Sequence, residues 1–150
     1  MSKFQTGKAP IHLWVVGLFS LLWNAMGSMD YYMIRTRNIE WISQTPNIAP
    51  QDMLEWVDSL PVWAQLGWGL CVWLGLAGAI LLLMRRRWAV PAFALSLAGA
   101  VAGLANPLLG SPPPEALAQG FMRYMPVVIF AIAGGCCFYA SRQKQAGILR

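Results

Sequence analysis

One polar stretch interrupts the first apolar run of the chain and supplies most of its chemistry-bearing side chains. The stretch reads WNAMGSMDYYMIRTRN and covers residues 23–38. At helical spacing, Asn24, Tyr31 and Arg35 share one face, and Asp30 lies on the neighbouring face. An amide, a carboxylate and a phenol so placed offer hydrogen bonds to a polar solute. They offer the same bonds to a neighbouring helix.

Two further polar side chains complete a candidate outward-facing pocket. Gln65 lies at the start of the second apolar run, and Arg123 lies at the start of the fourth. The candidate substrate-binding set is Asn24, Asp30, Tyr31, Gln65 and Arg123.

A structural interpretation of the same residues stays open. A buried amide without a partner is costly, so we expect Asn24 to hydrogen-bond within the bundle. The expected partners are Ser96, Asn106, Gln65 or a backbone carbonyl that Pro126 leaves free. In this interpretation Asp30 is an interfacial acid, and its expected neighbours are Arg35, Arg37 or Arg123.

Residues for covalent or metal chemistry are few. His12 is the single histidine, and one histidine supplies neither two axial haem ligands nor a zinc site. The three cysteines, Cys71, Cys136 and Cys137, all fall in apolar runs without redox or metal spacing. We therefore expect no cofactor, no metal and no enzymatic activity.

Four apolar segments must position these side chains. Only 11 % of the residues are charged and 57 % are hydrophobic, whereas soluble domains carry about 25 % charged residues. A spanning helix needs roughly 20 apolar residues. Segments of that length lie at about residues 11–33, 62–84, 88–109 and 121–140. The sequence predicts one all-α integral membrane domain, residues 1–150, folded as a membrane-spanning four-helix bundle.

Charge predicts the orientation of this bundle. The basic residues on one side are Lys3, Lys8, Arg85, Arg86, Arg87, Arg142, Lys144 and Arg150, and all six acids lie on the other side. The positive-inside rule then puts both termini in the cytoplasm of a bacterium and the bundle in its inner membrane. We expect Arg85, Arg86 and Arg87 to contact anionic lipid headgroups. Because the basic residues flank the spans in separate clusters, nucleic acid is not an expected partner.

The two loops on the acidic side are predicted to carry helical segments. The first helix should continue through residues 34–43, IRTRNIEWIS. A short amphipathic helix, PQDMLEWVDSL, should follow in the periplasmic loop, with Pro50 in its first turn. In the second loop, Glu115, Gln119 and Arg123 form a polar stripe at i, i+4 and i+8. Pro126 should kink the last span.

Small residues predict close helix packing. Gly67, Cys71, Gly75 and Ala79 recur every four residues in the second span. In lipid, helices associate through such small residues because their backbones can approach closely. We expect the stripe to join helices within one chain.

Two quoted segments carry a family resemblance. WVVGLFSLLWNAMGSMDYYMIRTRN and PVWAQLGWGLCVWLGLAGAILLLMRRRWAVPAFALSL, with the loop between them, resemble a family of small four-span bacterial inner-membrane proteins. The resemblance covers roughly residues 10–109. Members of that family are uncharacterised and are sometimes labelled sugar transporters. The resemblance therefore implies transport as one expectation and supplies no catalytic residues.

Two functions follow as hypotheses. The first is transport of a small polar solute, with a sugar as one candidate, through the pocket around Asn24 and Asp30. The second is a non-catalytic accessory or scaffold subunit that packs against a larger membrane complex. A transporter of four helices would need to form a homodimer to enclose a path, because little lumen remains between packed side chains.

Overall fold

The chain folds into helices, and four of them are long and apolar enough to cross a membrane. The computed structural model describes residues 10–110 and 112–150, the side chain of residue 104 excepted. The long helices are α1 (Ile11–Arg35), α4 (Val62–Leu83), α5 (Ala89–Leu109) and α6 (Met125–Gln145). No strand occurs in these described ranges. The predicted all-helical fold with four long apolar helices is confirmed for the described residues.

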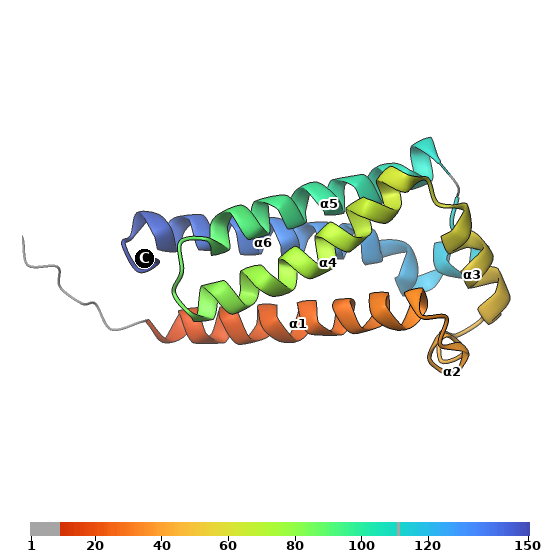
Figure 1. Cartoon of the computed structure of the whole chain (residues 1–150), viewed down its shortest axis with the longest axis horizontal. Helices are drawn as coiled ribbons and strands as arrows, with labels where there is room; N and C mark the ends of the chain where they lie inside the picture. The colour runs from red at the N-terminus through yellow and green to blue at the C-terminus, as the bar shows by residue number, and fades with distance from the viewer. Residues whose placement is uncertain (1–9, 111) are drawn as a thin grey trace, which may run out of the picture.

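The long helices pack in the order α1, α4, α5, α6 (Figure 1). The turn between α4 and α5 lies at the same end as the start of α1 and the end of α6. We call this the basic end, because it holds Arg85–Arg87, Arg142, Lys144 and Arg150. The opposite end, called the cap end, holds the short helices α2 (Ile39–Ile42), α3 (Pro50–Ser59), η1 (Glu115–Ala118) and η2 (Gly120–Tyr124).

The first connection departs from the predicted continuation of helix one. α1 ends at Arg35, and Arg37 adopts a left-handed conformation with φ 56°. The Thr36 side chain donates to the Tyr32 carbonyl at 2.9 Å, and Asn38 then caps α2 by accepting from the Trp41 amide. The expected helix through residues 34–43 is wrong because these local side-chain bonds compete with the helical ladder.

Helix α3 covers part of the cap end. Pro50 stands in its first turn, where a missing N–H costs nothing. Its buried residues Met53 and Val57 pack with Ile34 of α1 and Ile42 of α2 in a small apolar cluster. The charged residues Asp52, Glu55 and Asp58 stay exposed. The amphipathic pattern therefore buries α3 against the end of α1.

The second connection also differs from the prediction. Gln119 is extended and Gly120 has φ 57°, so the chain breaks between the 3₁₀ helices η1 and η2. Gln119 donates to Glu115 at 2.9 Å, but the break prevents one continuous helical stripe with Arg123. α6 begins at Met125, directly after η2, so Pro126 stands in its first turn, and a kink there stays a prediction. The helical segment long and apolar enough to span a membrane is Gly120–Gln145, which begins within one residue of the predicted residue 121.

Close backbone contact joins α4 and α5. A Cβ added at Gly99 would lie 2.7 Å from the Cys71 amide nitrogen and closer still to the Gly67 carbonyl. Ser96 donates to the Cys71 carbonyl at 2.6 Å across the same interface. The predicted stripe of small residues therefore does let two helices approach within one chain.

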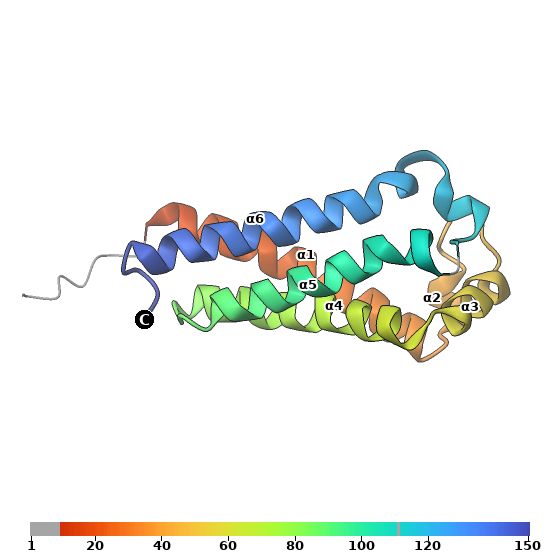
Figure 2. The ribbon, with the colours of Figure 1, turned by 90° about the horizontal axis from the view of Figure 1, so that it is seen from above.

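Helix α6 is the least enclosed of the long helices. Over the most apolar part of each span, 22 % of residues are buried in α1, 33 % in α4 and 35 % in α5, but only 6 % in the span with α6. α6 packs mainly on α5. Figure 2 shows that α1 and α6 cross near the basic end and diverge toward the cap end. The four helices therefore form an arc that is open between α1 and α6 toward the cap end.

Candidate functional site

Polar side chains connect the middle of the bundle. Asn24 donates through Nδ2 to the Ser20 carbonyl at 2.8 Å, within α1. The Cys136 thiol of α6 donates to the Ser20 hydroxyl at 3.4 Å, and Ser28 donates to the Val72 carbonyl of α4 at 3.2 Å. Ser20 and Ser28 are buried. The bonds of Ser20 and Ser28 therefore join α1 to α6 and α4 near the middle of the bundle.

The amide of Asn24 bonds to a partner outside the predicted set. The expected partners lay on other helices, whereas the bond to Ser20 stays in the same helix. The Asn24 Oδ1 oxygen occupies the space that a side chain of residue 75 would fill, so Gly75 is required there. The expectation of an interhelical hydrogen bond through the Asn24 amide is therefore wrong. Asn24 joins α1 to α4 by close packing.

Tyr31 belongs to an aromatic cluster. Its ring meets Trp68 edge-to-face at a centroid distance of 4.8 Å and Trp73 at 6.3 Å, both on α4. Such edge-to-face pairs stabilise packing by about 0.5–1.5 kcal/mol beyond area burial. The phenol oxygen lies against Gly69, where a Cβ would come within 3.1 Å of it. Through these contacts Tyr31 packs the cap-end half of α1 against α4.

Asp30 is an exposed acid with an unexpected partner. Its Oδ1 accepts from the indole Nε1 of Trp41 at 3.1 Å. The expected basic neighbour Arg37 instead pairs with Asp58 of α3 at 2.9 Å. The Asp30 contact holds α2 against α1.

Gln65 lies at the cap end of α4 and contacts an arginine that the candidate set omitted. Arg35 donates through Nη1 to Gln65 Oε1 at 3.1 Å. Gln65 donates in turn to the Leu60 carbonyl at 2.9 Å. Arg123 is exposed in η2. The five predicted site residues therefore lie in different surroundings. None of them lines the two cavities found at the cap end and the basic end.

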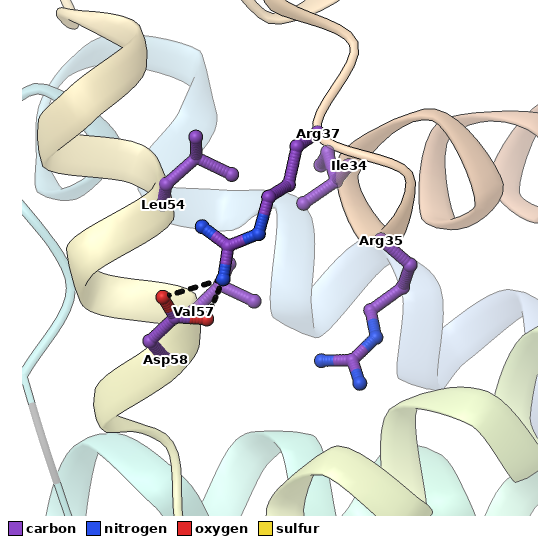
Figure 3. Close-up of a pocket in the computed structure, with 6 residues that line it drawn as sticks. All are labelled: Ile34, Arg35, Arg37, Leu54, Val57 and Asp58. Atoms are coloured by element: carbon purple, nitrogen blue, oxygen red, sulfur yellow. Dashed lines mark hydrogen bonds and ion pairs between the residues drawn. The ribbon is translucent and has the colours of Figure 1, made fainter.

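A cavity of about 90 Å³ lies at the cap end, and Arg35 is one of its lining residues (Figure 3). It is bordered by the end of α1, the turn after it and one face of α3. Its lining residues are Ile34, Arg35, Arg37, Leu54, Val57 and Asp58. This site was not predicted from the sequence, because its acid, Asp58, lies 21 or more residues from the arginines Arg35 and Arg37. The clue in the sequence was the pair of arginines directly after an apolar helix.

The basic end carries a second recess of about 340 Å³ between α5 and α6. Its lining residues are Val90, Ser141, Lys144 and Gln145. The adjoining turn is fixed by main-chain bonds, because Arg87 N donates to Arg150 O and Arg150 N donates to Arg85 O, each at 2.8 Å. Cationic side chains of Arg86, Arg87 and Lys144 are exposed around it.

Possible metal ligands stay apart in the described part of the chain. Cys71, Cys136 and Cys137 are free thiols. No group of three His, Cys, Asp or Glu side chains converges within residues 10–110 and 112–150. His12 Nδ1 lies 2.5 Å from the Tyr139 hydroxyl, a contact that joins α1 to α6 near the basic end.

These features define an all-helical chain with four helices fit to span a membrane, consistent with a multi-pass membrane protein. Comparison of the chain with protein-family models, curated proteins and solved structures finds no match.

Proposed function

We propose that the protein is a non-catalytic subunit of a membrane assembly and that α6 packs against a helix of another subunit. The observation that carries this proposal is the sparse packing around α6. In the most apolar part of the segment Gly120–Gln145, 6 % of residues are buried, against 22–35 % in the corresponding parts of the other three long helices. The polar groups at mid-height already bond within the chain. An open arc of helices offers one free side to a partner, and that side includes α6.

The outward face of α6 suits a close helix contact. Val127, Ala131, Gly135 and Phe138 follow each other at helical spacing and are all exposed. A Cβ at Gly135 would meet no described heavy atom within 4 Å. Small residues four apart allow two backbones to approach in lipid. The same face is proposed to meet the partner, which is either a second copy of this chain or a larger complex.

Native mass spectrometry of the protein, extracted gently from its own membrane, tests this proposal. We expect a complex heavier than the 16.6 kDa chain, and we expect Gly135→Leu to release the chain from it. Gly103→Leu on α5 is the matched control, because a Cβ at Gly103 also meets no described heavy atom within 4 Å. A lone monomer would refute the subunit role. A complex that survives Gly135→Leu but not Gly103→Leu would refute the α6 interface.

The placement in the membrane is part of the proposal. We place the basic end in the cytoplasm of a bacterium and the cap end in the periplasm, with both termini inside. The gathering of Arg85, Arg86, Arg87, Arg142 and Lys144 at one end supports this orientation through the positive-inside rule. Lys3 and Lys8, which the orientation also uses, lie outside the described residues. Arg85, Arg86 and Arg87 would meet anionic headgroups there, and a fluorescent protein fused after Arg150 should fold and fluoresce in the cytoplasm.

Transport of a small polar solute is the second candidate. The polar cavity at the cap end, with Arg35 held by Gln65 beside it, favours this function. The resemblance of residues 10–109 to small four-span proteins labelled sugar transporters also supports it. Uptake of small polar solutes, sugars included, into proteoliposomes is the test. Uptake that is unchanged by Arg35→Gln would remove transport through the cavity at the cap end. Uptake that is unchanged by Asn24→Leu combined with Asp30→Asn would remove transport through the pocket predicted from the sequence.

A further inference from the structure

The cavity at the cap end has a mainly polar lining that includes two guanidinium groups, with a smaller apolar part. Figure 3 shows Arg37 reaching from the turn toward Asp58 on α3, while Arg35 extends from the last turn of α1 on another side. Ile34, Leu54 and Val57 supply the apolar part of the lining. The volume of about 90 Å³ can hold several water molecules. The site is therefore both cationic and large enough for a small molecule.

Arg37 is held in place before any ligand arrives. Its backbone has φ 56°, a conformation that a side chain other than glycine rarely adopts. Its Nη2 donates to both carboxylate oxygens of Asp58, at 2.9 and 3.0 Å. Strained residues that persist in a structure are found often at binding sites. The left-handed turn directs this arginine toward α3 and into the cavity lining.

Arg35 is held as well, but by a neutral partner. The Gln65 amide oxygen accepts from its Nη1 at 3.1 Å, and Gln65 is itself anchored to the Leu60 carbonyl. The one ion pair among the described residues joins Arg37 to Asp58, so no described carboxylate lies within 4.0 Å of the Arg35 guanidinium. Its other N–H groups keep their capacity to donate, since a guanidinium carries five.

Charge and shape together select the ligand class. Two arginines and one aspartate leave a net charge of +1 around the cavity, which suits a monoanion. A planar carboxylate matches the fork of a guanidinium better than a spherical ion does. The apolar side chains favour a short alkyl group attached to that carboxylate.

We propose that the cavity of Ile34, Arg35, Arg37, Leu54, Val57 and Asp58 binds a small organic monocarboxylate, with Arg35 as the main ionic contact. The carbonyl end of α1 does not oppose this anion strongly. The amides of Thr36, Arg37 and Asn38 donate to the carbonyls of Tyr32, Ile34 and Met33 at 2.9–3.0 Å. This site is independent of the subunit role, because it lies on the cap end and not on the exposed face of α6.

The experiment is calorimetric titration of sodium butyrate into the full chain, held in nanodiscs of zwitterionic phospholipid. We expect saturable binding that Arg35→Gln weakens by about tenfold or more, since a charge-assisted hydrogen bond is lost. Gln65→Glu should abolish binding while it keeps the arginine, because the new carboxylate would occupy the Arg35 guanidinium. Arg142→Gln, which changes an exposed arginine at the basic end, should leave the affinity unchanged.

Several results would overturn the proposal. Butyrate that does not bind, or that binds equally to the Arg35→Gln and Gln65→Glu proteins, would remove Arg35 from the site. Equal affinity for butanol would show an apolar cavity without anion recognition. Loss of butyrate binding in nanodiscs that contain phosphatidylglycerol, with wild-type and Arg142→Gln proteins alike, would assign the site to a lipid phosphate in place of a soluble carboxylate. None of these results depends on whether the chain forms a complex.

Discussion

The contact between Gly99 and the backbone of α4 allows a quantitative prediction for Gly99→Ala. The new methyl group would lie 2.7 Å from the Cys71 nitrogen, whereas ordinary van der Waals contact begins at about 3.4 Å. The obstacle is backbone, which no side-chain rotation relieves. Because the Gly67 carbonyl oxygen lies closer still, α4 and α5 must separate locally by more than about 0.7 Å. That shift would lengthen the 2.6 Å bond from Ser96 to the Cys71 carbonyl beyond about 3.3 Å, outside the usual range for an O–H donor.

The expected cost follows from these two effects. Overpacking of a tight interface costs about 1–3 kcal/mol, and the weakened hydrogen bond adds about 1 kcal/mol. Alanine in place of glycine returns up to about 1 kcal/mol of helix propensity. We expect Gly99→Ala to lower the free energy of unfolding by about 1–3 kcal/mol. Gly103→Ala, whose methyl group meets no described heavy atom within 4 Å, should be neutral or slightly stabilising.

Unfolding in mixed micelles, with sodium dodecyl sulfate as denaturant and tryptophan fluorescence as readout, measures both variants against the wild type. The comparison between Gly99 and Gly103 removes the propensity effect, because both substitutions gain the same methyl group in α5. Equal unfolding midpoints for the two variants would refute the close α4–α5 approach. A normal midpoint for Gly99→Ala alone would do the same.

Two further predictions concern α1 and the cap. Asn24→Leu should destabilise the bundle by about 1–3 kcal/mol in the same micelle assay, because a branched side chain would be forced against Gly75; a more stable variant would contradict the packing seen there. Asp58→Asn should cost no more than about 1 kcal/mol, and the loss should shrink at high salt, because the Arg37–Asp58 pair is more than half exposed on both sides. A salt-independent loss would mean that the pair acts through packing.

The spans were predictable because hydrocarbon thickness and side-chain polarity decide them locally. α4 and α5 begin and end within one residue of the segments chosen from apolar length. The spacing of small residues in α4 likewise predicted the close contact with α5. The start of α6 was harder, because Pro126 fits either a kink or a first turn. The change from the 3₁₀ helix η2 to α6 at Met125, which only the folded chain reveals, places Pro126 in the first turn of α6.

The polar contacts were less predictable for a different reason. Asn24 bonds to the Ser20 carbonyl, four residues away on its own helix, whereas the predicted partners lay on other helices. Arg35 and Gln65 are 30 residues apart, and Arg37 and Asp58 are 21 apart. Their meeting depends on how α1 ends, and the left-handed Arg37 at that end has no signature in residue type. Long-range pairs at a turn therefore need the fold before they can be named.

The pairing of Arg150 with the turn between α4 and α5 also bears on how the protein is made. Leu149 is buried in the apolar cluster with Leu82 and Phe93, next to the two main-chain bonds of Arg150. A ribosome releases residues 148–150 only after α4, α5 and α6 have been synthesised. The turn between α4 and α5 is therefore made before the segment that bonds to it. Its two bonds to Arg150 can form only after α6 has been synthesised.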